Sequence, residues 1–192
     1  GRPVAARIRP RFSGRRLLTM FNWVFRATQS DESIKKAAED KYRKAIALRD
    51  GVGVKRDPSA AVKLFTEAAD VDHPAATSDL GACYYQGVGV PQDHDKALKL
   101  FQRAAEAGDV KAQFNVGVCH WNGRGTPRDE AAAVESFLKA AEAGHPRAQF
   151  FLGYAYEQGR GVKQDRRKAR QWFKQAAKAG DARAWQEIAA EM

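Results

Sequence analysis

The seven-residue stretch Gly51-Val-Gly-Val-Lys-Arg-Asp57 decides how this chain folds, because it returns three more times at a constant interval. The later copies are Gly87-Val-Gly-Val-Pro-Gln-Asp93, Gly123-Arg-Gly-Thr-Pro-Arg-Asp129 and Gly159-Arg-Gly-Val-Lys-Gln-Asp165. Each copy begins 36 residues after the one before it. A fixed period in this range is typical of repeat proteins, in which each unit packs mainly against its neighbours.

The residues after each stretch predict a helix. The closing aspartate is a favourable N-cap, and Pro58 follows the first of them at a position that suits proline. In the second unit the apolar residues fall on one helical face and are Ala97, Leu100, Phe101, Ala104 and Ala105. Three glycines are expected to end this helix with a positive φ, and they are Gly108, Gly144 and Gly180. Asp72 takes that place in the first unit.

A second helix is predicted to begin almost at once after the first one ends. Its starts are marked by His73-Pro74, Asp109, His145-Pro146 and Asp181. Its inward face is expected to hold Ala76, Leu80 and Tyr84, then Ala112, Val116 and His120, then Ala148, Leu152 and Tyr156. A glycine inside a helix costs about 1 kcal/mol relative to alanine. One such glycine at the same place in three units predicts that another helix approaches closely there, at Gly81, Gly117 and Gly153.

The chain is therefore predicted to be all-α, a right-handed α/α superhelical solenoid of antiparallel helix hairpins in 36-residue repeats. The expected solenoid spans 31–192, with units at about 39–74, 75–110, 111–146 and 147–182 and a capping helix at 182–190. Residues 1–30 are expected to form a separate basic arm.

The pattern resembles the Sel-one-like repeat family, which is related to the tetratricopeptide repeat. The fourth unit carries the resemblance best, through Ala148, Leu152, Gly153, Tyr156, Gly159, Gly161, Val162, Asp165, Lys168-Ala169, Trp172-Phe173 and Ala176-Ala177. The first unit departs most, because it lacks the Leu-Gly pair and has Leu48 in the tyrosine position. The resemblance implies an adaptor that assembles protein complexes, although such a fold sets no single function.

The charge of the chain is concentrated in the arm. The formal net charge is +10, and residues 1–30 hold seven of the 33 basic residues and none of the 23 acidic ones. Residues predicted to anchor the arm are Arg7, Arg9, Arg11, Arg15, Arg16, Phe21, Trp23 and Phe25. Part of the arm is expected to be an amphipathic helix held by protein, a membrane surface or RNA. Arginine-rich and free of acids, the arm also resembles a transit peptide, which predicts a mitochondrion or, alternatively, a plastid.

No catalytic, cofactor or metal site is predicted. The Gly-x-Gly loops lack the Lys-Ser/Thr of a phosphate-binding loop and the preceding strand of a dinucleotide site. The cysteines Cys83 and Cys119 share one repeat position with alanines, and no ligand pairs are spaced as in zinc sites. We expect reduced, buried thiols, no enzyme activity and no small-molecule substrate.

Two surfaces are candidates for binding a partner. The first is an apolar groove of side chains that the repeat pattern leaves free, comprising Tyr85, Phe114, Val118, Trp121, Phe150 and Tyr154. Packing between neighbouring units is the alternative explanation for these residues. The second surface is a basic patch of Arg166, Arg167, Arg170 and Lys174, for which a solvated helix face is the alternative.

These features predict a non-catalytic scaffold that mediates protein–protein contacts within a large, organellar multi-subunit complex. The alternative is an RNA-associated structural subunit, such as a component of a mitochondrial ribosome, anchored by the arginine-rich arm.

Overall fold

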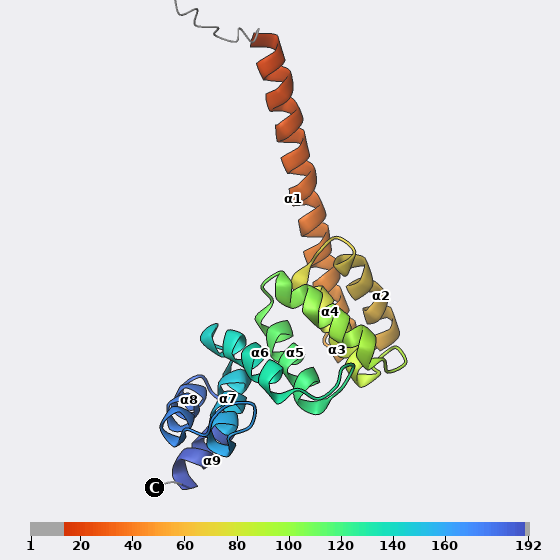
Figure 1. Ribbon diagram of the computed structural model, residues 1–192. Coiled ribbons are helices and arrows are strands. Elements are labelled where there is room, and N and C mark those ends of the chain that lie inside the picture. Colours follow the sequence, from red (N-terminus) through yellow and green to blue (C-terminus); the bar gives the residue numbers. More distant parts are fainter. Residues whose placement is uncertain (1–13, 191–192) are drawn as a thin grey trace, which may run out of the picture. The chain divides into compact units, whose positions relative to one another are not determined.

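A computed structural model describes the backbone of residues 14–190 and the side chains from Ser30 onward, except those of Trp185 and residues 188–190. Helices are the only regular elements within that part of the chain (Figure 1). They are α1 (Gly14–Asp50), α2 (Pro58–Ala69), α3 (Pro74–Gln86), α4 (His94–Glu106), α5 (Val110–Asn122), α6 (Glu130–Glu142), α7 (Pro146–Gln158), α8 (Arg166–Lys178) and α9 (Ala182–Ala190).

The chain divides into two compact units, Gly1–Ala37 and Ala38–Met192. The second unit is the solenoid. From α2 to α9, each helix packs against its neighbours in the sequence, as expected for stacked hairpins. This arrangement confirms the predicted all-α solenoid. In the first unit, α1 begins at Gly14, so the helical backbone reaches into the predicted arm.

The predicted caps are present. Asp57, Asp93, Asp129 and Asp165 each accept a hydrogen bond from the backbone N–H three residues later, at 2.9 to 3.0 Å. Gly108, Gly144 and Gly180 have φ values of 87°, 86° and 94°. Asp72 takes the same left-handed conformation with φ 57°, so the first repeat has the same backbone conformation there without a glycine.

The close approach predicted at the helix glycines is also confirmed. A Cβ at Gly81, Gly117 or Gly153 would lie 2.6 to 2.8 Å from a ring carbon of Phe101, Phe137 or Phe173, respectively. Real Cβ atoms do not come this near to a packed ring, so each glycine sets the separation of the two helices of its hairpin. The first repeat, at about 39–74, has the buried residue Ala45 in this position.

In three of the four loops, the second glycine packs against the repeat before it. A Cβ at Gly125 would lie 2.3 Å from the backbone oxygen of His94 at the start of α4, and φ at Gly125 is 72°. Gly89 and Gly161 make the equivalent approach to Pro58 and Glu130. Gly53, in the first loop, has a similar φ but no atom within 4 Å of a built Cβ.

This difference predicts unequal costs for one substitution at two equivalent positions. Gly53→Ala should cost about 1–2 kcal/mol, because only the left-handed conformation opposes it. Gly125→Ala should cost about 1–3 kcal/mol more, because the methyl group also meets rigid backbone. Urea unfolding of both variants measures the difference, and equal losses would contradict the proposed role of Gly125 in joining repeats.

Candidate protein-interaction surface

The six side chains predicted to form a groove do not share one environment. Phe114 and Trp121 keep only 4% and 8% of their surface exposed and belong to the core. Their ring centroids lie 5.7 and 5.9 Å from that of Phe137. Both residues pack between helices, so the prediction that they offer a free surface to a partner is wrong.

The repeat position of Phe114 is not equally buried in every unit. Its equivalent Ser78 is only 3% exposed, whereas its equivalent Phe150 is half-buried. The repeat pattern of the sequence therefore gave no signal for the burial of Phe114. The other members of the predicted groove, Tyr85, Val118, Phe150 and Tyr154, are half-buried and keep part of their surface accessible.

Arginines from the following repeat cover the aromatic rings, and sequence reasoning missed them. Arg124 lies 5.3 Å from the Tyr85 centroid, and its equivalent Arg160 lies 4.0 Å from that of Trp121. The same holds for a second set, in which Arg147 covers Phe114 at 5.2 Å and Arg183 covers Phe150 at 4.3 Å. Such cation–π contacts contribute about 0.5–1 kcal/mol each at exposed sites. The 36-residue spacing within each set was the available signal.

These four arginines differ in their charge partners. Arg160 forms an ion pair with Glu130 at 2.6 Å, and Arg183 pairs with Asp181 at 2.7 Å. The pairing holds the pKa of the Glu130 carboxyl below its ordinary value. Arg124 donates to the Tyr85 hydroxyl at 3.0 Å, and neither it nor Arg147 has a carboxylate partner among the described residues.

Between α3 and α5 lies a cavity of about 160 Å³, here called the α3–α5 pocket. Phe101, Phe114 and Val118 supply apolar lining, and the lining also includes Tyr85, Asn115 and Arg147. The burial of Phe114 thus does not remove it from the site, because its ring forms part of the pocket wall. This pocket combines aromatic and aliphatic lining with polar side chains, and it is bordered by a cation with no acid among the lining residues.

The pocket is open because two residues of α5 are smaller than their counterparts on α7. Asn115 and Val118 stand where α7 carries Phe151 and Tyr154. There the Phe151 ring lies 5.2 Å from Phe137, and Tyr154 lies 6.3 Å from Trp121, so the larger side chains pack onto the core. At α5 the corresponding volume is left open.

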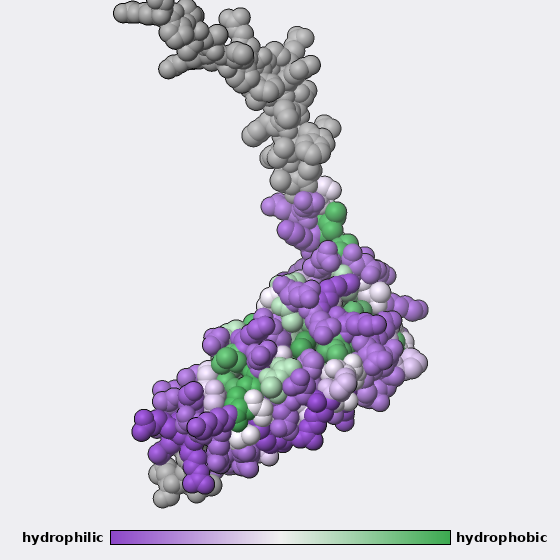
Figure 2. All heavy atoms as spheres, in the orientation of Figure 1, coloured by the Kyte–Doolittle hydropathy of each residue, from purple (hydrophilic) through white to green (hydrophobic). Residues whose placement is uncertain are grey.

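The predicted basic patch is on α8. Arg166, Arg167, Arg170 and Lys174 are exposed, and with Gln171 they line an open hollow of about 660 Å³. Figure 2 shows hydrophilic residues gathered over this end of the solenoid. The structure brings the four basic residues together, and their binding role stays a prediction.

The predicted anchoring residues of the arm cannot be placed in the same way. Arg7, Arg9 and Arg11 lie outside the described residues. Arg15, Arg16, Phe21, Trp23 and Phe25 fall within α1, but their side chains are outside the described part. Within the described part of the chain, no helix has the length and apolar character needed to span a membrane.

Two of the histidines and both cysteines occupy positions in which they support the fold. The described residues contain no group of three or more His, Cys, Asp or Glu side chains able to hold a metal ion. His73 and His145 each accept a backbone N–H at 3.2 Å and cap α3 and α7. Cys83 and Cys119 are buried and unpaired, and burial raises the pKa of each thiol to about 11.

The raised pKa predicts that both thiols are inert in the folded protein. The thiolate is the reactive form, and at about pH 8 a group with this pKa is ionised in about one molecule in a thousand. Ellman's reagent should label neither cysteine until denaturant is added. An Asn122→Cys variant at the exposed end of α5 should react at once and serves as the control, and rapid labelling of Cys83 or Cys119 would contradict the burial.

Comparison with known proteins identifies the repeat. The Sel1 repeat family model matches residues 41–73, 74–109, 110–145 and 146–181. A solved Sel1 repeat protein from Oxalobacter formigenes is 36% identical with a TM-score of 0.72, over 77% of this chain and 60% of that one. A protective antigen of uropathogenic Escherichia coli that displays an SLR fold is 32% identical with a TM-score of 0.75, over 82% of this chain and 35% of that one.

An uncharacterized protein from Neisseria meningitidis is 46% identical over 48 residues, which are 25% of this chain and 10% of that protein. This chain therefore spans between a tenth and three fifths of the length of these relatives. Four consecutive matches cover most of the chain, and its fold agrees with those of two solved relatives. The chain belongs to the Sel1 repeat family.

Proposed function

We propose that this chain is a non-catalytic scaffold whose α3–α5 pocket holds a partner protein through a segment that combines an apolar side chain with a carboxylate. Sel1 repeat proteins generally act as scaffolds for protein–protein interaction. The observation that carries the proposal is the apolar wall of this pocket beside Arg147, which no described carboxylate neutralises.

The chemistry of the pocket favours this class of ligand. The half-buried Val118 and Tyr85 line the pocket together with the edges of the buried rings of Phe101 and Phe114, and full burial of an apolar side chain contributes about 1.5–3 kcal/mol. An arginine guanidinium binds a carboxylate with two parallel hydrogen bonds. Arg124, on the loop after α5, adds a second positive charge beside Tyr85, which also lines the pocket. A segment with an apolar side chain and a carboxylate could pack against the apolar lining and pair with the arginine at the same time.

We further propose that the scaffold is a subunit of a large assembly and that residues 1–30 anchor in a second partner. Support for the anchor is the seven arginines of the arm, with no acid to offset them. The same composition supports a mitochondrial or plastid location, and this remains a proposal.

The second candidate is an RNA-associated subunit. The observation that favours it is α8, where six basic residues and no acidic ones occur within Arg166–Lys178. Basic side chains bind phosphates in a strongly salt-dependent manner. Loss of association on nuclease treatment would identify this function, because a peptide in the α3–α5 pocket needs no nucleic acid.

Two surface substitutions test the scaffold. Arg147→Glu reverses the charge beside the pocket, and Val118→Tyr fills the pocket with the residue that α7 uses in the same position. Each should weaken partner binding about tenfold or more, equivalent to about 1.4 kcal/mol. Alanine at Phe114 or Trp121 is unsuitable, because it would remove core packing.

The measurement is affinity purification of the tagged chain from its native cells, with and without nuclease, followed by quantitative mass spectrometry. Arg167→Glu on α8 is the control, because it makes the same charge change away from the pocket. The scaffold proposal predicts one set of proteins that survives nuclease, is kept by Arg167→Glu and is lost with both pocket variants. Proteins that vanish with nuclease and with Arg167→Glu, but tolerate the pocket variants, would contradict it.

A further inference from the structure

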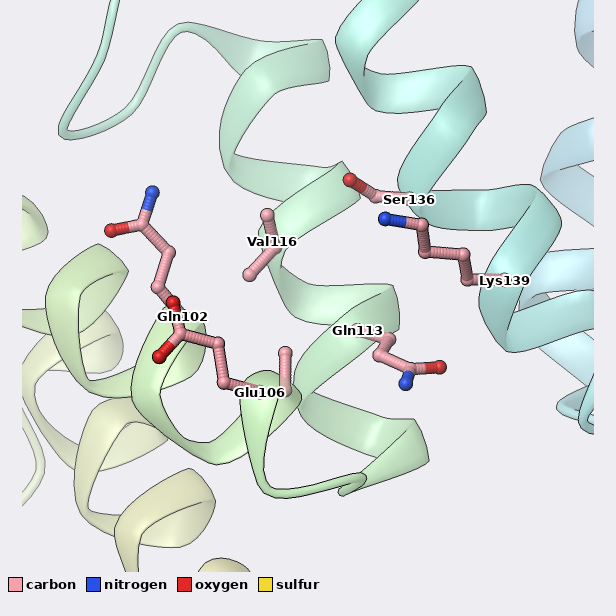
Figure 3. A pocket seen from close by; sticks show the side chains of 7 residues that line it. Gln102, Glu106, Gln113, Val116, Ser136 and Lys139 are labelled. Atoms are coloured by element: carbon pink, nitrogen blue, oxygen red, sulfur yellow. The ribbon is translucent and has the colours of Figure 1, made fainter.

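A second cavity, of about 230 Å³, lies between α4 and α6 and is called here the α4–α6 pocket. Val116 of α5 lies between its two sides (Figure 3). Gln102 and Glu106 come from α4, and Ser136 and Lys139 extend toward the pocket from α6. Val116 and Val118 are separated by about 200° around α5, at 100° per residue, so the two pockets open on different faces of that helix.

Comparison with the equivalent positions of the neighbouring repeats shows why this cavity exists. At the preceding junction the positions of Val116 and Ser136 hold Leu80 and Leu100, and at the following junction they hold Leu152 and Trp172. Leu80 and Leu152 are buried at 4% and 1% exposure, and Leu100 and Trp172 pack against the core. Valine and serine supply much less apolar volume, so this junction alone of the three lacks its large side-chain pair.

The helices around the cavity cannot close over it. Gly117 sits against the Phe137 ring, and Gly125 sits against the backbone of His94. These two contacts hold α5 at a set separation from α6 and from the start of α4. The missing volume therefore remains as a surface cavity and is not removed by collapse.

The polar groups at the cavity are available to a ligand. The Ser136 hydroxyl donates to the Ala132 carbonyl at 3.0 Å and is satisfied. Within the described part of the chain, the side chains of Gln102, Glu106, Gln113 and Lys139 have no hydrogen-bond or ion-pair partner. The two amides can bond to the backbone of an extended segment, and the opposite charges of Glu106 and Lys139 lie on opposite sides.

From these observations we infer that the α4–α6 pocket is a second docking site, which receives one leucine or tryptophan side chain from a partner protein. These are the residue types that the other two junctions place in the same space. The volume is below the roughly 300–1,000 Å³ of small-molecule sites, which favours a single side chain over a cofactor. Among these two, tryptophan is enriched among the buried residues that carry most of the binding energy of protein interfaces. This site is independent of the proposed role of the α3–α5 pocket.

The test fills the cavity with the residues of the preceding junction. Val116→Leu/Ser136→Leu restores the pair found at Leu80 and Leu100, so the variant should unfold at the same temperature as the wild type or higher. Loss of binding in this variant would then not reflect loss of fold. Val118→Tyr, which fills the other pocket, is the matched control.

The probe is a phage-displayed library of random peptides selected on the immobilised wild-type protein. We expect a class of peptides that share a leucine or tryptophan, bind the filled variant at least tenfold more weakly, and bind Val118→Tyr and Arg147→Glu as they bind the wild type. The inference is overturned if no peptide is enriched, or if every enriched peptide still binds Val116→Leu/Ser136→Leu. Peptides lost only with Val118→Tyr and Arg147→Glu would support the α3–α5 pocket alone, so the two sites can fail separately.

Discussion

The solenoid depends on the contact between a glycine in one helix and a phenylalanine ring in the next. At Gly117 there is no room for a single added carbon, since it would lie 2.6 Å from the Phe137 ring. The same contact at Gly81 and Gly153 gives three successive hairpins nearly one geometry. Because that geometry is fixed, differences between repeats appear as differences in side-chain volume and charge. Both pockets are such differences, since α5 carries Asn115, Val116 and Val118 where α7 carries larger residues.

Much of this architecture could be predicted from the sequence, because its determinants are local and are repeated. The N-cap aspartates, the glycines with positive φ and the helix glycines act within one or two turns of their own position. Even the exception at Asp72 follows the rule, because its backbone takes the left-handed conformation that glycine has in the other units. Each of these signals recurs in three or four repeats, so the interpretation of one copy is supported by the others.

The binding surface was harder to predict, because it depends on how repeats meet. Phe114 and Trp121 look like groove residues within their own helix, but the rings of Phe137 in α6 and Phe151 in α7 lie against both of them. The arginines over Tyr85, Phe114, Trp121 and Phe150 all come from the following repeat. Helical periodicity describes one helix at a time. It carries no information on which side chain of the next repeat contacts a given ring. The pockets were missed for the same reason.

The direction of these arginine contacts has a consequence for how the surface changes in evolution. Each ring is covered by a cation encoded 33 or 39 residues further along the chain. The surface properties of one repeat therefore depend partly on the sequence of the next repeat. Duplication or loss of a whole repeat would leave the backbone continuous yet pair each ring at the new boundary with a different cation. Recombination at repeat boundaries would therefore create new surfaces at the seam while every individual repeat kept its own sequence.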